Sequence, residues 1–221
     1  MRDLPAPVRA EISARTIGHY DRHADRYREG THDHDVAQNV AALLDAITGP
    51  PPFTILDFGC GPGRDLATFR RLGHRAIGLD GAARFVEMAR AHSGCEVWQQ
   101  DFLTLDLPRE TFDGVFANAS LFHVPTAALS EVLTAVHAAL KPDGVLFASN
   151  PRGDDREGWQ AERYGVYHSL ARWREIVSAA GFAELHHYYR PEGAPRDAQP
   201  WLATVWRRTA AQQPEHDQPE D

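Results

Sequence analysis

The sequence predicts a doubly wound α/β fold, in which helices cover both faces of a mainly parallel sheet. Three observations predict it. Short apolar runs alternate with helical patterns between residues 53 and 149, a glycine-rich loop follows the first run, and two strands close the pattern with no helix between them. Alternating strands and helices imply parallel neighbours joined by right-handed crossovers.

The alternation begins with an apolar run over 53–58, which is typical of a buried strand. A helix over 64–73 follows and stops at Gly73. A second strand is expected over 75–80. The next helix, over 83–92, places three apolar residues on one face: Phe85, Val86 and Ala89.

Two more strands are expected over 95–101 and 112–118, and a fifth over 144–150. The helix over 126–141 is the most periodic segment of the chain. Its apolar face consists of Leu129, Val132, Leu133, Val136 and Leu140.

The last elements differ in pattern. A helix over 169–181 has Ser169 as its expected N-cap and Gly181 beyond its end. Strands over 182–189 and 201–208 follow it directly. We expect these two strands to form an antiparallel pair at one edge of the sheet.

The N-terminal segment precedes this pattern. An amphipathic helix is expected over 34–47, with Asp33 as its N-cap. The polar stretch before it carries Tyr20 and Tyr27. We interpret residues 1–35 as a cap or lid and residues 36–208 as the main domain.

Composition limits the function classes. A chain of 221 residues that is 43% hydrophobic can bury one sizeable core. The net charge is −8, and the acidic residues of 209–221, which lack Lys and Arg, account for half of it. We expect a disordered tail there. Nonspecific nucleic-acid binding needs a basic face, so no nucleic-acid partner is expected.

Other features of the sequence indicate compartment and partners. No apolar run is long enough to span a membrane, and the first residues lack an apolar signal core. Cys60 and Cys95 form neither a disulfide framework nor a metal-binding spacing. We therefore expect a cytoplasmic monomer or homodimer with no membrane partner.

The glycine loop lies in the stretch ILDFGCGPGRD, residues 55–65. Gly59 and Gly61 occupy the first and third positions of a dinucleotide fingerprint, but Arg64 occupies the sixth, where glycine is needed. Pro62 also removes a backbone N–H. No Gly-Lys-Ser/Thr follows, so a P-loop is excluded as well.

Acidic residues at two further strand ends indicate a nucleoside. Asp80 ends the second strand, where a carboxylate can accept hydrogen bonds from both ribose hydroxyls. Asp101 ends the third strand and precedes Phe102. Asp101 can accept an exocyclic amine, and Phe102 can form an apolar wall.

Taken in order, these motifs resemble a class I S-adenosylmethionine-dependent methyltransferase of the small-molecule type 11 or 25 kind. The resemblance rests on ILDFGCGPGRD, AIGLDGAARFVEMAR, VWQQDFLTLDLPRETFDGVFANASLFHV and ALKPDGVLFASNP, and it runs from about residue 36 to residue 208. It implies a Rossmann-like seven-stranded sheet of order 3-2-1-4-5-7-6 with strand 7 antiparallel. It also implies S-adenosyl-L-methionine as cofactor and S-adenosyl-L-homocysteine as product.

The resemblance assigns the cofactor contacts residue by residue. The methionine half is expected near the glycine loop, the ribose near Asp80 and the adenine near Asp101. Arg64 either reaches the cofactor carboxylate or is solvated, and Cys60 fills the loop. The full expected set is Tyr20, Tyr27, Asp57, Gly59, Cys60, Gly61, Arg64, Asp80, Gly81, Asp101, Phe102, Asn118 and Ala119.

The acceptor side is expected in two segments. His123, after the fourth strand, is either a general base or a histidine that packs under its loop. The segment 150–169 is interpreted as a lid over an aromatic or anionic acceptor, with a plain surface loop as the alternative. The expected acceptor contacts are His123, Arg152, Trp159, Arg163, Tyr164, Tyr167 and Arg190.

Two histidine-containing stretches, 31–35 and 186–187, suggest metal binding at first sight. Adjacent histidines on a strand point to opposite faces, so no metal is expected. The predicted function is methyl transfer to an O, N or S atom of a small molecule. The alternatives are a protein or RNA methyltransferase, or a noncatalytic partner subunit that binds S-adenosylmethionine.

Overall fold

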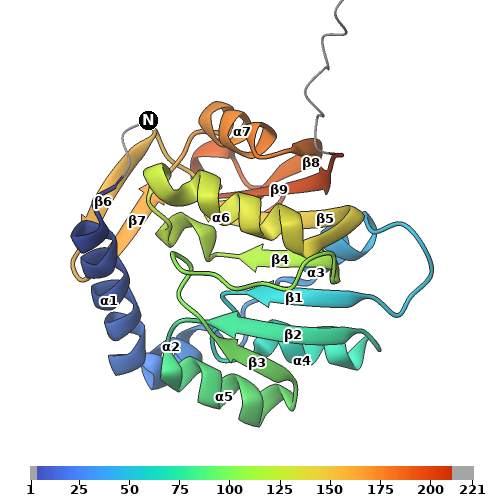
Figure 1. The fold of residues 1–221 in the computed structure, drawn as a ribbon, viewed down its shortest axis with the longest axis horizontal. Helices are drawn as coiled ribbons and strands as arrows, with labels where there is room; N and C mark the ends of the chain where they lie inside the picture. Colours follow the sequence, from blue (N-terminus) through green and yellow to red (C-terminus); the bar gives the residue numbers. More distant parts are fainter. Residues whose placement is uncertain (1–3, 211–221) are drawn as a thin grey trace, which may run out of the picture.

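A seven-stranded sheet forms the centre of the computed structural model, which describes residues 4–210 (Figure 1). Its order is β3-β2-β1-β4-β5-β9-β8, and β9 runs antiparallel to both β5 and β8. This confirms the expected order and the antiparallel final strand. The strands are β1 (Thr54–Phe58), β2 (Arg75–Asp80), β3 (Glu96–Gln99), β4 (Phe112–Asn118), β5 (Leu140–Pro151), β8 (Phe182–Arg190) and β9 (Trp201–Arg208).

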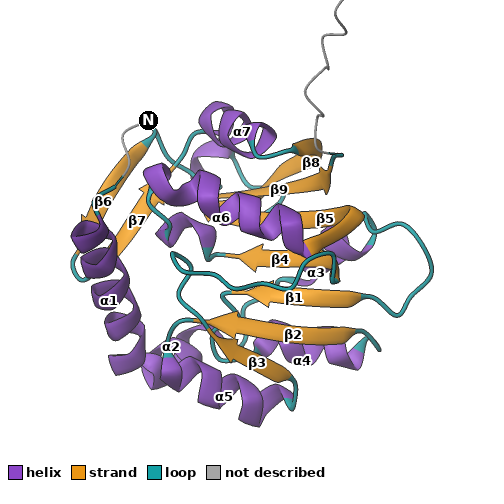
Figure 2. Cartoon of the chain, in the orientation of Figure 1, coloured by secondary structure: helices purple, strands orange, loops and turns teal. Residues whose placement is uncertain are grey.

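Helices cover both faces of this sheet (Figure 2). On one face lie α3 (Ala37–Leu44), α4 (Arg64–Arg71) and α5 (Ala83–Ser93), and on the other lie α6 (Thr126–Ala139) and α7 (Leu170–Ala179). Helices α1 (Ala6–Arg22) and α2 (Ala24–Thr31) instead lie near the edge to which the arrowheads of β1, β2 and β4 point (Figure 1). The N-terminal segment therefore lies where doubly wound folds bind ligands.

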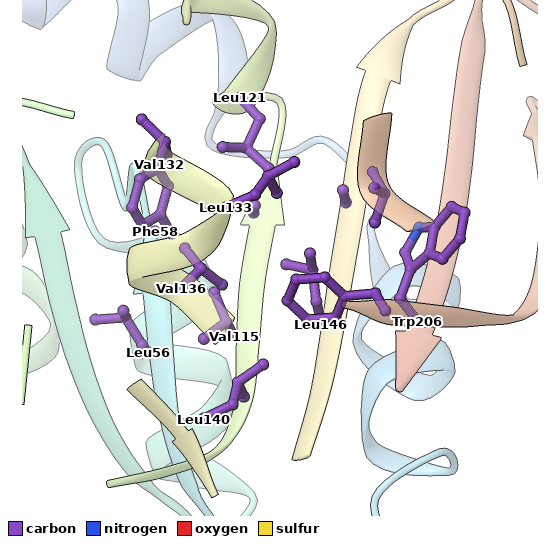
Figure 3. Packing of buried hydrophobic residues seen from close by; sticks show 14 of the residues in the cluster. Leu56, Phe58, Val115, Leu121, Val132, Leu133, Val136, Leu140, Leu146 and Trp206 are labelled. Carbon is purple, nitrogen blue, oxygen red and sulfur yellow. The ribbon is translucent and has the colours of Figure 1, made fainter. Parts of the chain in front are cut away.

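The core has two layers because successive strand residues point to opposite faces. Leu56 and Phe58 of β1 pack under α6, together with Leu146 and Trp206 (Figure 3). Ile55, which directly precedes Leu56, packs on the other face against α3 and α4. Both layers are fully buried, so β1 and the glycine loop after it stand on a rigid base.

The segment 150–169 is not an irregular loop. Most of it forms a hairpin of β6 (Arg156–Gln160) and β7 (Arg163–Tyr167), paired antiparallel and separate from the main sheet. The two-residue turn contains Ala161 at a φ of 53°. At the base of the hairpin, Asp155 accepts hydrogen bonds from the Ser169 N–H (2.7 Å) and hydroxyl (3.0 Å). These bonds join the hairpin to the start of α7.

Two helix starts test the capping predictions. Ser169 caps α7 as expected, since its hydroxyl accepts a hydrogen bond from the Arg172 N–H. The prediction for Asp33 is wrong. Helix α3 begins at Ala37, and Asp35 accepts the Ala37 N–H at 2.9 Å, because it lies two residues before that donor and Asp33 lies four.

The C-terminal boundary lies slightly later than expected. Thr209 was assigned to a disordered tail, but its N–H and hydroxyl both donate to the Gly181 carbonyl. The remainder of that expected tail, from residue 211, lies outside the described residues. Within 4–210, none of the helices has the length and apolar character needed to cross a membrane.

Candidate active site

The glycine loop after β1 folds back against β2 and the loop after β4. The Gly59 and Cys60 N–H groups donate to the Leu79 carbonyl. Gly59 has a φ of 80°, and a Cβ there would lie 2.4 Å from the Cβ of Ser120. This position therefore requires glycine both for its backbone angle and for the close approach of the β4 loop.

Asp57 lies beneath this loop, where only 2% of its surface is exposed. Among the described residues, none donates a hydrogen bond to its Oδ2. Burial, and secondarily the nearby Asp65 carboxylate, raise the pKa of Asp57 well above its usual range. Asp57 is thus a buried acceptor that a neighbouring positive charge would stabilise.

Arg64 and Asn118 form a half-buried polar network beside the loop. Arg64 donates to both carboxylate oxygens of Asp65, at 2.7 and 2.9 Å, and to the Thr31 carbonyl at 2.9 Å. Asn118 donates to Asp65 at 3.3 Å and accepts from Asn39 at 2.9 Å. These contacts attach the end of α2 to the loop and occupy both side chains with protein partners.

A cavity of about 680 Å³, counted with its opening to solvent, lies above the loop between α1 and the strand ends. This is the size range of small-molecule sites. Of the expected cofactor residues it brings together Tyr20, Tyr27, Gly59, Gly61, Asp80, Gly81, Asp101, Phe102 and Ala119, and His123 also lines it. Asp57, Cys60, Arg64 and Asn118 do not line it.

Asp80 and Asp101 both line this cavity. Asp80 accepts hydrogen bonds from the Ala82 N–H at 2.9 Å and the Gly61 N–H at 3.0 Å. Burial nevertheless raises the pKa of Asp80 to about 6. Asp101 accepts the Leu103 N–H at 2.9 Å and the Ser13 hydroxyl of α1.

His123 stands at the end of the 3-10 turn η1 (Leu121–His123) after β4. Its Nδ1 lies 2.6 Å from the Tyr164 carbonyl oxygen, and its Nε2 lies 2.7 Å from the Tyr20 hydroxyl. Burial lowers the pKa of His123 to about 4. The imidazole is therefore neutral near pH 7.

A second cavity, of about 520 Å³ with its opening, lies between η1 and the β6–β7 hairpin. His123 lines this cavity as well as the first. The other lining residues are Phe122, Pro151, Gln160, Arg163, Tyr164 and Tyr167. Three of the expected acceptor residues of the hairpin thus meet beside His123.

Three other expected acceptor residues lie outside both cavities. Arg152 donates to the Arg196 carbonyl at 2.8 Å, and Arg190 donates to the Asp35 carbonyl. Trp159 is 38% exposed, with the Arg15 guanidinium 3.8 Å from its ring centroid.

The sequence did not indicate Ser13, Phe85 or Ser120, which also line the first cavity. Ser13 meets Asp101 across 88 residues of chain, and such a distant contact leaves no local pattern. Ser120 was detectable in principle, since it directly follows the expected contacts Asn118 and Ala119. Its buried hydroxyl has no hydrogen-bond partner within the described part of the chain.

Within the described residues, the histidines of 31–35 and 186–187 do not come together in a group of three or more potential metal ligands. His187 contacts Glu184 through Nδ1 at 2.8 Å, while His186 stacks on Tyr188. Within residues 4–210 a different trio, His19, His23 and Glu162, brings potential metal ligands within 4.8 Å of one another. Arg22 donates to the same Glu162 carboxylate at 3.0 Å.

Comparison with known proteins agrees with this geometry. Residues 55–144 match the family model described as a methyltransferase domain. Residues 55–144 thus carry a methyltransferase domain, and together with the fold this match supports the resemblance to class I S-adenosylmethionine-dependent methyltransferases. The same comparisons support S-adenosylmethionine as the cofactor.

Individual proteins that resemble this chain share about a quarter to a third of its residues over the aligned parts. A Burkholderia thailandensis 1,6-didemethyltoxoflavin-N1-methyltransferase, solved with 1,6-didemethyltoxoflavin and S-adenosylhomocysteine, superposes with a TM-score of 0.74 at 24% identity over 95% of this chain and 94% of that one. A 24-methylenesterol C-methyltransferase 2 of Oryza sativa is 32% identical over 70% of this chain and 46% of its own length. A ubiquinone biosynthesis O-methyltransferase of Cereibacter sphaeroides is 32% identical over 52% and 49%. This chain thus spans about half the length of these two curated relatives.

Proposed function

We propose that this protein transfers the methyl group of S-adenosylmethionine to an O, N or S atom of an aromatic or anionic small molecule. One observation carries the proposal: His123 lines both the cavity beside Asp80 and Asp101 and the cavity beside the hairpin. A methyl donor bound in the first cavity and a methyl acceptor bound in the second would meet at His123.

The residues of the first cavity fit the cofactor. Two carboxylates, Asp80 and Asp101, suit ribose hydroxyls and an exocyclic amine, and Phe102 supplies an apolar wall stacked on Phe58 at 4.4 Å between ring centroids. Asp57 lies beneath the glycine loop and does not line this cavity, but its buried, unpartnered Oδ2 would favour a positive charge nearby. When bound, the cofactor supplies a methyl group already activated by its sulfonium.

The residues of the second cavity suit an aromatic or anionic acceptor. Arg163 supplies a positive charge to this cavity, and Phe122, Tyr164 and Tyr167 supply aromatic rings. The protein's part in the reaction is to position the acceptor at attack distance and to exclude water. Small molecules named for the relatives, including a sterol, a ubiquinone precursor and a toxoflavin precursor, support an acceptor of this size.

The proposal is tested in two stages. Calorimetry first compares S-adenosylhomocysteine with NAD, and only the former is expected to bind. Labelled S-adenosylmethionine is then incubated with a metabolite library, with protein and RNA as separate acceptor pools. Label in protein or RNA but in no metabolite, or binding without turnover on any pool, would contradict the proposal.

A matched pair of variants tests the acceptor cavity. Arg163→Met is expected to raise the KM for anionic acceptors about tenfold or more, since it removes a charge-assisted hydrogen bond. Arg156→Met is the control, because Arg156 lies on the same hairpin but pairs with Asp154 on the surface. Equal KM values for both variants and the unmodified protein would exclude Arg163 from acceptor binding.

A further inference from the structure

Tyr20 lines the first cavity, and its hydroxyl contacts both His123, which lines the two cavities, and Arg163, which lines the second. The Tyr20 oxygen is 2.7 Å from His123 Nε2 and 3.3 Å from Arg163 Nη1. The three side chains come from α1, η1 and β7. Three separate elements thus converge on one phenol.

The direction of each hydrogen bond follows from the chemistry of its partners. The Tyr164 carbonyl can only accept, so His123 Nδ1 carries a proton and donates to it. The imidazole is neutral, and its Nε2 therefore holds a lone pair that accepts the Tyr20 proton. Arg163 can only donate, so its N–H points at the oxygen of Tyr20.

We propose that Tyr20 and His123 form a proton-accepting pair for the methyl acceptor, with Tyr20 touching the acceptor and His123 taking up the proton. This deepens the proposed function and rests on it. Tyr20 was expected to contact the cofactor, so the proposal gives it a different role. Tyr164 is a positioning residue, since its carbonyl fixes which nitrogen of His123 accepts.

The step balances in atoms and charge. The acceptor's O or N atom forms a bond to the methyl carbon while the carbon–sulfur bond breaks, its electron pair staying on sulfur. The acceptor's proton moves to the Tyr20 oxygen, and the proton of Tyr20 moves to His123 Nε2. One positive charge disappears from sulfur as one appears on the imidazole, so the net charge of the site stays constant.

Constant charge explains how a buried histidine can act as the final base. Burial and the Arg163 guanidinium both disfavour a protonated His123, which lowers its pKa to about 4. If His123 took up a proton while the sulfonium was still charged, a second positive charge in the site would make that protonation still less favourable. A proton arriving as that charge disappears does not raise the total positive charge.

The pair also defines an acceptor class. An acceptor that is fully ionised near neutral pH, such as a carboxylate, has no proton to lose and gains nothing from the pair. A weakly acidic O–H or ring N–H does gain, because its removal by a positioned base accelerates transfer about 10²-fold or more. We therefore assign the acceptor to weakly acidic phenols and aromatic N–H compounds.

Two phenols of different acidity test this assignment. Phenol keeps its proton at pH 7.5, whereas 4-nitrophenol is largely ionised. Tyr20→Phe keeps the ring that packs on Tyr27 and Phe85 but removes the hydroxyl. We expect kcat/KM to fall about 10²-fold with phenol and less than about fivefold with 4-nitrophenol. Equal losses with both phenols would overturn the pair.

His123→Asn is the second variant, because its amide N–H can still donate to the Tyr164 carbonyl while the accepting nitrogen is lost. It should show the same selective loss. Tyr189→Phe is the control, since Tyr189 lies outside both cavities, with its ring 3.4 Å from the Arg196 guanidinium. No turnover of either phenol by the unmodified protein would overturn the acceptor class.

Two measurements without turnover separate this proposal from others. Calorimetry with S-adenosylhomocysteine should give the same Kd, within about twofold, for Tyr20→Phe and the unmodified protein. A Kd more than tenfold weaker would return Tyr20 to the cofactor, and no binding by the unmodified protein would remove the proposed function itself. Nitrogen NMR of labelled histidine should show His123 protonated at Nδ1 alone at pH 7, and protonation at Nε2 instead would overturn the relay.

Discussion

Asp80→Asn should make the cofactor-free protein more stable at alkaline pH while it weakens nucleoside binding. The folded structure raises the pKa of Asp80 to about 6 from a usual 3.8. The folded state thus holds this proton more tightly than the unfolded state does. The resulting stability is fully present below pH 3.8 and is lost as the pH rises through about 6.

The size of the effect follows from the pKa shift. Carrying the charge of Asp80 into the folded state at pH 8 costs about 3 kcal/mol relative to pH 3, and about 1.4 kcal/mol of this develops between pH 5 and pH 8. Asparagine has no such charge, but it replaces one of two acceptors that face the Gly61 and Ala82 N–H groups. That lost hydrogen bond costs about 1 to 2 kcal/mol at every pH.

Urea unfolding followed by tryptophan fluorescence measures the difference. The stability of Asp80→Asn relative to the unmodified protein should rise by about 1.4 kcal/mol from pH 5 to pH 8. Asp45→Asn is the control, since Asp45 is exposed at the end of α3, and its relative stability should not change with pH. A relative stability of Asp80→Asn that is constant from pH 5 to pH 8 would refute the reasoning.

Three further substitutions test the fold, each by urea unfolding. Gly63→Ala should cost about 2 kcal/mol or more, because φ there is 92° and a Cβ would lie 2.7 Å from the Cα of Ala89; an unchanged midpoint would contradict this close packing. Trp206→Ala should cost about 3 to 5 kcal/mol, since this side chain is fully buried, and a loss under 1 kcal/mol would mean that the site collapses without a cavity. Ser169→Ala should cost about 1 kcal/mol by removing the acceptor of the Arg172 N–H, with Ser169→Thr retaining most of the stability.

The main sheet could be predicted from sequence because its signals are local and mutually consistent. Buried strands such as 54–58 are mainly apolar, and glycines such as Gly73 mark where helices stop. The sequence also predicted that Asp80 and Asp101 lie near one site, because the strand ends of a parallel sheet meet at one edge.

The acceptor side could not be predicted in the same way. The β6–β7 hairpin lacks the Asn-Gly or Asp-Gly turn that usually marks a hairpin, and Ala161 adopts the positive φ instead. Its strands are short, and β6 is largely exposed, so they show no apolar alternation. Contacts such as Tyr20 with His123 join residues 103 apart, and only the folded chain reveals them.

The way the hairpin is attached has a consequence for diversification. Tyr164 holds His123 through its carbonyl oxygen and Thr16 of α1 through its N–H, so both tethers use main-chain atoms. Trp159, Glu162 and Arg163 also contact α1 through their side chains. The other side chains of 156–167 can therefore change without releasing the imidazole or α1. Exchanging them should alter acceptor preference and leave the cavity beside Asp80 and Asp101 unchanged, so new acceptors can be engineered at this hairpin.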